Sequence, residues 1–156
     1  MSVEIERKFL VSGDYRDEVR RTYDIAQGYI CKSGGRTVRV RIRDNRAFIT
    51  IKGSSEDGGV SRFEWEKEIS VEDARELMPL CVSGVISKKR HLVDFGGHTF
   101  EVDEFLGENE GLTVAEVELS DADENFERPE WLGEEVTSDR RYSNAALSEV
   151  PFCKWE

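Results

Sequence analysis

Apolar and polar residues alternate with a period of two through much of the chain, which is the pattern of strands with two different faces. Residues 36–43 read Arg-Thr-Val-Arg-Val-Arg-Ile-Arg, so a strand there places Arg39, Arg41 and Arg43 opposite valine and isoleucine. About eight segments show this alternation or another strand pattern. The strands are predicted over residues 3–8, 25–31, 36–43, 47–52, 62–70, 85–93, 99–105 and 113–119.

Helical patterns are short and lie between or after these strands. Ser70 precedes apolar residues at helical spacing and is a suitable cap for a helix over 71–78. The break at residues 12–14 can cap a short helix to about residue 21, and residues 53–59 form a polar, glycine-rich loop. Further short helices are predicted over residues 121–127 and 143–149.

The charged faces of the strands are segregated by sign. Basic residues gather on residues 39–43, whereas glutamates gather on residues 64–68 and again on residues 116–118. A wetted antiparallel sheet also has one charged face, but cross-strand attraction favours mixed signs there. Separate blocks resemble subsites, with acids for a cation and bases for an anion. A barrel closed with its charged faces inward would bring the blocks together.

Composition limits the functions that the chain can have. The 156 residues suit a single domain spanning residues 1–156. A formal charge of −11 disfavours nucleic acid and anionic membranes as partners. The three cysteines, widely spaced and odd in number, fit a reducing cytoplasm, and no run of 18 apolar residues is present. His91 and His98 have no partner pattern and are expected to be structural or surface residues.

The motif Glu4-Ile5-Glu6-Arg7-Lys8, followed by Phe-Leu-Val, resembles the start of the CYTH superfamily, also called triphosphate tunnel metalloenzymes. The tail over residues 133–144 is similar to the small bacterial branch of that family. Other landmarks occur in family order along nearly the whole chain. They are Gln27-Gly28-Tyr29, Arg39-x-Arg41, Lys52, Glu64-x-Glu66, Lys88-x-Arg90, Glu101-x-Asp103 and Glu116-x-Glu118.

The resemblance implies a mainly β fold, a closed eight-stranded antiparallel β-barrel with a charged tunnel and a few flanking helices. It implies that the tunnel binds a triphosphate together with Mg²⁺ or Mn²⁺. Carboxylates suit such hard cations, and guanidinium groups suit phosphate oxygens. The expected metal ligands are Glu4, Glu6, Glu116, Glu118 and Asp103. The expected substrate-binding residues are Lys8, Arg39, Arg41, Lys52, Lys88 and Arg90. The expected catalytic residues are Glu4, Glu6, Lys8, Glu64, Glu66 and Lys88.

The resemblance favours hydrolysis of inorganic tripolyphosphate to pyrophosphate and phosphate. Alternatives are a class IV-type adenylyl cyclase, a thiamine triphosphatase and a non-catalytic module that binds polyphosphate or nucleotide. The expected partner is a small-molecule triphosphate, without nucleic acid or membrane, and exposed apolar strands could allow a homodimer. Whether Tyr29, Arg43 and residues 139–142 face the tunnel stays open at this point.

Overall fold

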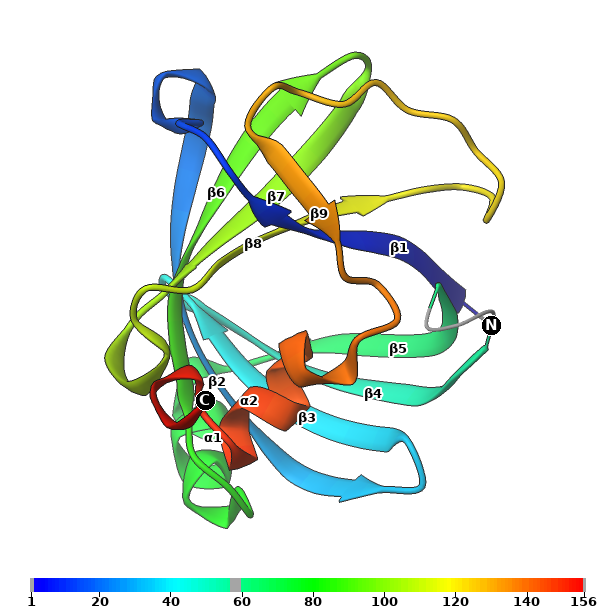
Figure 1. Cartoon of the computed structure of the whole chain (residues 1–156). Coiled ribbons are helices and arrows are strands. Elements are labelled where there is room, and N and C mark those ends of the chain that lie inside the picture. Colours follow the sequence, from blue (N-terminus) through cyan, green and yellow to red (C-terminus); the bar gives the residue numbers. More distant parts are fainter. Residues whose placement is uncertain (1, 57–59, 156) are drawn as a thin grey trace.

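The computed structural model describes residues 2–56 and 60–155, and its strands form one antiparallel sheet that closes on itself (Figure 1). The strands follow the order β5-β4-β3-β2-β6-β7-β8-β1, and β1 pairs with β5 to complete the barrel. The predicted closed eight-stranded antiparallel barrel is therefore confirmed. Its strands are β1 (Ser2–Val11), β2 (Val19–Ser33), β3 (Arg36–Arg43), β4 (Arg46–Glu56), β5 (Ser61–Ile69), β6 (Ile86–Phe95), β7 (His98–Phe105) and β8 (Thr113–Glu118).

Strand β1 pairs with one strand along one edge and with two strands in succession along the other. One edge pairs with β8 over residues 6–10, while the other pairs with β5 over residues 2–5. Beyond that point the same edge pairs with β9 (Leu132–Glu135) through Phe9 and Val11. The short segment Leu-Gly-Glu-Glu lacks the alternation that marks the other strands, so the sequence pattern did not predict β9.

The charged faces of the strands point into the barrel, as the segregated charges indicated. Lys88, Arg90 and Asp103 are at least nine-tenths buried although all three are charged. Their sequence neighbours on the opposite face, including Val93 and Val102, belong to an apolar cluster outside the barrel. The barrel thus has a polar interior and apolar outer surfaces that other segments cover.

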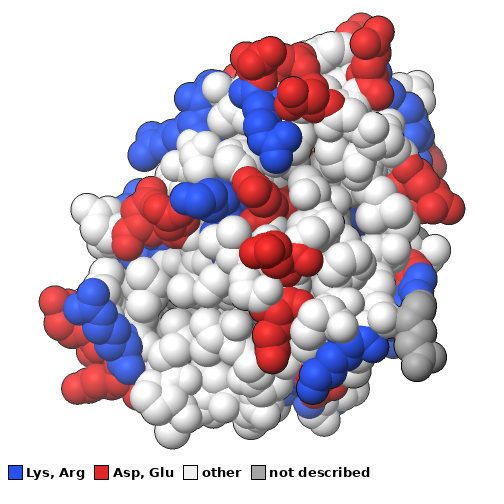
Figure 2. Space-filling view, turned by 60° about the vertical axis from the view of Figure 1, so that its left-hand side comes forward, with Lys and Arg blue, Asp and Glu red and all other residues white. Residues whose placement is uncertain are grey.

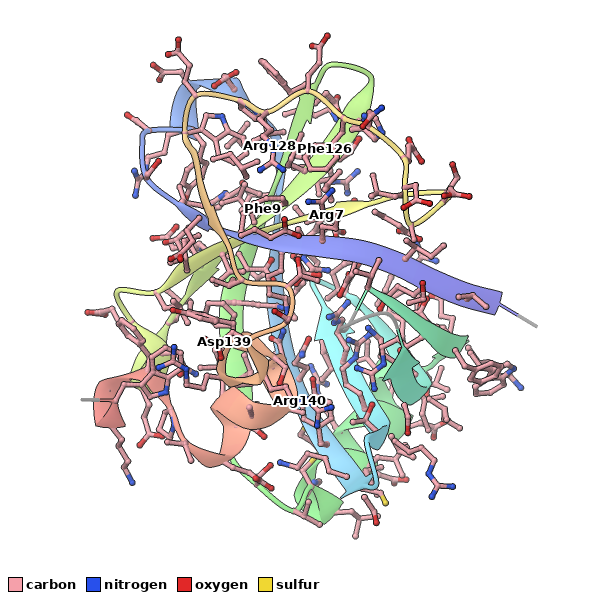
Figure 3. All side chains as sticks on the ribbon, turned by 45° about the vertical axis from the view of Figure 1, so that its right-hand side comes forward. Arg7, Phe9, Phe126, Arg128, Asp139 and Arg140 are labelled. Carbon is pink, nitrogen blue, oxygen red and sulfur yellow. The ribbon has the colours of Figure 1, made fainter. Side chains whose placement is uncertain are left out.

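Two segments cover the outer surface. Helix α1 (Val71–Leu77), capped by Ser70, packs Ala74 against Val40 and Ala47 on the outside of β3 and β4. The segment after β8 packs Phe126 and Trp131 against the outside of β1 and β7. Figure 3 shows Phe126 beside Phe9, Arg7 and Arg128, and both guanidinium groups lie within 5.3 Å of the centre of the Phe126 ring.

One end of the barrel is covered by the C-terminal segment. Helix α2 (Asn144–Glu149) lies across this end in Figure 1, reached by the chain that descends from β9 through Asp139 and Arg140 (Figure 3). Leu147 packs there against Ile86 and Phe105, with Phe152 and Trp155 around them. The predicted helices over 71–78 and 143–149 are therefore present, each about one residue shorter.

Two other helix predictions were wrong. Residues 16–18 form only one 3-10 turn, and β2 begins at Val19, well before the predicted residue 25. Residues 121–127 form no helix, because Asp121 accepts a hydrogen bond from the Asp123 amide and starts a turn instead. The loop predicted over 53–59 begins within β4, and residues 57–59 lie outside the described residues.

Candidate active site inside the barrel

Strand β1 contributes three charged side chains to the barrel interior. Antiparallel pairing sets Glu6 opposite Glu118 and Lys8 opposite Glu116 on the same inward face. Because residues of a strand alternate between faces, Arg7 points outward, where it forms an ion pair with Glu135. The Glu-x-Glu-x-Lys pattern and the Glu-x-Glu pair of β8 thus lie on neighbouring strands, although about 110 residues separate them in the chain.

Glu6 and Glu116 are neighbouring acidic side chains on the paired strands β1 and β8. Burial raises the pKa of Glu6 well above its usual value, and the charges of Glu116 and Glu4 raise it further. Burial acts in the same direction on Glu116, but Lys8 and the hydrogen bond from Glu6 outweigh it and hold its pKa well below the usual value. The two carboxyl groups therefore titrate together, and Glu6 binds a proton more readily than Glu116 does.

Asp103 is the shared counter-ion of the two β6 cations. Its Oδ2 atom lies 2.7 Å from Lys88 Nζ and 2.9 Å from a terminal nitrogen of Arg90, while its Oδ1 lies 2.8 Å from Arg90 Nε. Burial would raise the pKa of Asp103, but the charges of Arg90 and Lys88 lower it overall. Both carboxylate oxygens of this expected metal ligand are thus occupied by cations in the structure.

Lys88 lies deep in the interior, with a side chain that is 0% exposed. Burial lowers its pKa to about 7, helped by the charges of Arg90 and Arg41 and opposed by Asp103. The ammonium group also donates to Asn144 Oδ1 at 3.0 Å, so the start of α2 contacts the tunnel directly. Lys8 reaches the same segment, since its Nζ lies 3.5 Å from the carbonyl oxygen of Tyr142.

Lys52, on β4, is paired with carboxylates from two other strands. Its Nζ lies 2.9 Å and 3.0 Å from the two carboxylate oxygens of Glu4 and 3.7 Å from Glu64. Burial, together with the charge of Glu4, raises the pKa of Glu64 to about 7. Lys52 therefore links β1 and β5, the two strands that close the barrel. Glu4, an expected metal ligand, is paired with this lysine in the structure.

Each of the two β3 arginines donates a hydrogen bond to a neutral side chain. Arg41 Nε donates to Gln27 Oε1 at 2.8 Å, and a terminal nitrogen of Arg39 donates to Thr50 Oγ1 at 3.1 Å. Gln27 and Thr50 are both 0% exposed and lie directly opposite these arginines on the adjacent strands. Thr50 in turn donates to Glu66 at 2.8 Å. The Glu66 carboxylate also lies 3.7 Å from the same terminal nitrogen of Arg39, so Arg39 has an acidic partner as well, whereas Arg41 is oriented by neutral Gln27.

No sequence pattern predicted a role for Gln27, Thr50 or Asn144. Two features of the sequence could have indicated the first two of these residues. Gln27 belongs to the Gln-Gly-Tyr landmark, and Thr50 shares a strand face with Lys52. Nothing in a strand pattern indicates that these neutral side chains would be buried among charges. Their contacts depend on cross-strand register and on the fold of the C-terminal segment.

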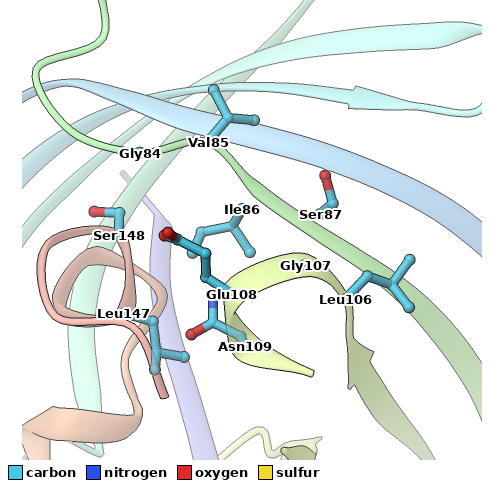
Figure 4. A pocket seen from close by; sticks show the side chains of 10 residues that line it. All are labelled: Gly84, Val85, Ile86, Ser87, Leu106, Gly107, Glu108, Asn109, Leu147 and Ser148. Carbon is cyan, nitrogen blue, oxygen red and sulfur yellow. The ribbon is translucent and has the colours of Figure 1, made fainter. Parts of the chain in front are cut away.

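The tunnel is blind at the end that α2 covers. On the inward faces of β6, β7 and β8, the charged residues give way to Ile86, Phe105 and Val114, which pack against Leu147. Behind this apolar cluster is a cavity of about 70 Å³ between the start of β6, the 106–109 turn and α2 (Figure 4). Tyr29, 5% exposed, faces the interior near this end and lies 3.4 Å from Gln27 through its hydroxyl.

The opposite end of the barrel carries more exposed charged side chains. Glu66 and Glu101 have side chains that are 42% and 39% exposed, and Glu118 ends β8 nearby. Arg43 lies on the same face as Arg39 and Arg41 but at the strand end, stacked on Tyr23 and Phe48. The open question about Arg43 is therefore answered, because it lines the rim of the tunnel.

Other residues that the sequence analysis singled out lie away from the tunnel. His91 contacts Thr22 and Glu104, and His98 contacts Glu124, all on the outer side. Asp139 accepts hydrogen bonds from the backbone and side chain of Arg141. The contact between residues 139–142 and a tunnel cation is made by the Tyr142 carbonyl oxygen, which accepts from Lys8 Nζ.

A preformed metal cage is absent from residues 2–56 and 60–155, since no three Asp, Glu, His or Cys side chains converge closely enough to form one. The oxygen donors nevertheless suit a hard divalent cation, which uses few protein carboxylates and completes its shell with phosphates and water. The charge of Glu116 helps to raise the pKa of Glu6, and a bound cation would relieve this repulsion between the two carboxylates. The donor set therefore fits such an ion.

The fold and the interior together define a class of protein, a closed barrel whose buried cations and carboxylates form a site for a polyanion. The family model of the CYTH domain matches residues 2–151, and the chain belongs to this family. The family expected from the Glu-x-Glu-x-Lys motif and its later landmarks is thereby confirmed.

Similar proteins of the same length are known. An inorganic triphosphatase of Acetivibrio thermocellus is 46% identical over 153 residues, covering 97% of each chain. One of Nitrosomonas europaea is 38% identical over 151 residues, covering 93% of this chain and 96% of its own. A crystal structure of an inorganic triphosphatase has a TM-score of 0.68 at 34% identity, covering 93% of this chain and 97% of that one.

Proposed function

We propose that this chain is a metal-dependent enzyme that hydrolyses a triphosphate inside its barrel, and that the substrate is inorganic tripolyphosphate. The observation that carries the proposal is the pair of neighbouring β3 arginines on the inward face, whose guanidinium groups Thr50 and Gln27 orient. The names of relatives at 46% and 38% identity support the substrate.

The chain's own residues supply binding and orientation. Arg39 and Arg41 present guanidinium donors from β3, while Lys8 and Lys88 present ammonium groups from β1 and β6 beside the C-terminal segment. Phosphoryl transfer relies mainly on positioning and charge neutralisation, so these groups would stabilise the charge that develops on the phosphates. We propose that Asp103 serves this site by orienting Lys88 and Arg90, because they occupy both its oxygens.

Glu4, Glu6, Glu116 and Glu118 are the residues that would hold Mg²⁺ or Mn²⁺ at the acidic side of the tunnel. A bound divalent ion would neutralise phosphate charge and lower the pKa of a coordinated water. Glu64 and Glu66 lie on β5, the strand that pairs with the first part of β1, and are proposed to accept a proton from attacking water or to orient it. The apolar closure behind Lys88 excludes bulk water from the blind end.

A substrate panel tests the reaction. Tripolyphosphate, ATP, thiamine triphosphate and pyrophosphate would be incubated with Mg²⁺ or Mn²⁺, and phosphate, pyrophosphate and cyclic AMP would be measured separately. We expect turnover of tripolyphosphate above the others. Cyclic AMP as the main product would replace hydrolysis with a cyclase, and binding without turnover would indicate a non-catalytic module.

The variant Glu6→Gln tests the role of the acidic side. It removes one carboxylate from the Glu6–Glu116 pair without changing side-chain size, so metal-dependent turnover should be lost while the fold persists. Glu104→Gln is a matched control on the outer face of β7, where Glu104 contacts His91. Full activity of Glu6→Gln would show that the Glu6 carboxylate is not part of the proposed site.

Other observations bear on the proposed cellular compartment and on nucleic-acid or membrane partners. Cys31, Cys81 and Cys153 are free thiols, which supports a reducing compartment such as the cytoplasm. On the face shown in Figure 2, acidic and basic side chains are interspersed rather than gathered into a basic track. No helix in the described part of the chain is long and apolar enough to span a bilayer.

We propose that the chain forms the homodimer that exposed apolar strands could allow, with the outer face of β4 and β5 as its contact. Ile51 and Trp65 are cross-strand neighbours there, 38% and 45% exposed, and Val3 on β1 is 57% exposed. Light scattering should give the mass of a dimer for the native chain and of a monomer for Trp65→Lys. A monomeric native chain would refute the assembly.

A further inference from the structure

A row of alternating arginines and aromatic rings lines the open rim of the barrel on three neighbouring strands. The guanidinium carbons of Arg21 and Arg43 lie 4.7 Å and 4.6 Å from the centre of the Tyr23 ring. Those of Arg43 and Arg46 lie 5.0 Å and 5.5 Å from the centre of the Phe48 ring. We call these five residues, Arg21, Tyr23, Arg43, Phe48 and Arg46, the rim row.

The rim row continues the tunnel's basic face outward. Arg39, Arg41 and Arg43 alternate along β3, so all three project to the inward face. A strand rises about 3.3 Å per residue, so Arg43 and Arg41, two residues apart, are separated by about 6.6 Å along β3. A chain of phosphates bound at Arg39 and Arg41 that extended toward the open end would therefore meet Arg43 next.

Two of the three rim arginines have no direct ion-pair partner among the described residues. Within residues 2–56 and 60–155, neither Arg21 nor Arg43 forms an ion pair or a side-chain hydrogen bond, whereas Arg46 makes two contacts with Glu68. The chain carries a net charge of −11, so acidic partners are abundant elsewhere. Unpaired guanidinium groups at the mouth of a polyanion site point to an anionic ligand.

The geometry favours phosphate over an organic ring at this place. Each aromatic ring is already contacted by two guanidinium groups, so much of its surface is occupied. What the row still offers is the N–H edges of Arg21 and Arg43, which match phosphate oxygens. A base or thiazolium ring would instead need a free aromatic face on which to stack.

We propose that the rim row is an outer subsite for the phosphates beyond the third of a linear polyphosphate whose end occupies the tunnel. The inference rests on the proposed triphosphate site. Because the other end of the barrel is closed by α2 and its apolar cluster, a longer chain can extend only through this mouth. The protein would thus bind long linear polyphosphate more tightly than tripolyphosphate.

Binding without metal tests the subsite. Isothermal titration in EDTA would compare tripolyphosphate with a longer linear polyphosphate, counted per chain end, on the native protein and on Arg21→Gln/Arg43→Gln. Glutamine removes charge but keeps a polar side chain of similar length. We expect the double variant to lose about tenfold in affinity for the longer chain, equal to about 1.4 kcal/mol, and to bind tripolyphosphate within about twofold.

Arg20→Gln is the matched control, because Arg20 is the neighbour of Arg21 on β2 and its charge is already paired with Asp94. It should leave both affinities unchanged, and thermal denaturation would verify that each variant is folded. Equal affinity of the double variant and the native protein for the longer chain would overturn the subsite. So would a loss confined to ATP, which would assign the row to an organic group. Failure of the native protein to bind tripolyphosphate would refute the proposed function instead.

Discussion

Lys88 Nζ and Asp103 Oδ2 lie 2.7 Å apart inside the barrel, on side chains that are 0% and 1% exposed. Ionised groups this deep are stable only when partners satisfy them, and Asp103 also holds Arg90. One carboxylate therefore maintains two cations of the tunnel, and its removal should affect stability as well as binding.

Asp103→Asn should destabilise the fold by about 3–5 kcal/mol, because two buried cations would lose their shared counter-ion. Urea denaturation of the metal-free protein measures the change. Asp94→Asn, which alters an exposed carboxylate paired with Arg20, should have a much smaller effect. Similar effects of the two substitutions would contradict a buried ion pair at Asp103.

Glu64 should make stability fall as pH rises between 4.5 and about 7. Its pKa is raised to about 7 in the folded state, so the folded protein retains a proton that the unfolded chain has already lost in this window. The stabilisation is complete below pH 4.5 and disappears as pH passes about 7. Denaturation at several pH values, without metal, should show a weaker decline for Glu64→Gln. Glu104→Gln should keep the native slope.

Gln27→Glu tests whether the residue that orients Arg41 must also be neutral. Glutamate keeps the acceptor for Arg41 Nε but neutralises the guanidinium, so metal-free affinity for tripolyphosphate should fall about tenfold while the protein stays folded. Gln27→Met, which removes the acceptor without adding charge, completes the comparison. Native affinity in Gln27→Glu would show that the neutrality of Gln27 has no function.

Leu147→Ala should destabilise the protein by about 2–5 kcal/mol, because Leu147 is 1% exposed and closes the blind end against Ile86 and Phe105. Val150→Ala is the control just after the same helix. Val150 is 56% exposed, so its truncation should change the free energy of unfolding by no more than about 0.5 kcal/mol. Equal losses would mean that α2 is not packed into the barrel end.

Gly28→Ala should cost about 1–3 kcal/mol through overpacking. A Cβ atom at this position would lie 2.5 Å from Cys81 Sγ and 3.1 Å from Cys81 Cβ. The glycine of the Gln-Gly-Tyr landmark thus makes room for the segment after α1. The double variant Gly28→Ala/Cys81→Ala should recover part of the loss, and a fully tolerated single variant would refute this account.

The strand content and the inward set of charges could be predicted from the sequence, because the period of two is a local property of each strand. Residues 36–43 form a strand with the predicted bounds, and Lys88 and Arg90 point to one face as expected. The motif order then indicated the family and the closed barrel. Local patterns failed at residues 14–21 and 121–127, where longer-range pairing and a turn replaced the expected helices.

The sequence by itself determined which side chains share a strand face and how many of them carry charge. Only the tertiary structure decided which groups meet, because contacts such as Asp103 with Arg90 and Gln27 with Arg41 depend on register between strands. Closure of the barrel also decided that the charged faces lie inside, where low exposure shifts the pKa of Glu6 and Lys88. A blind end built by α2 requires the last part of the chain to reach strands far away in sequence.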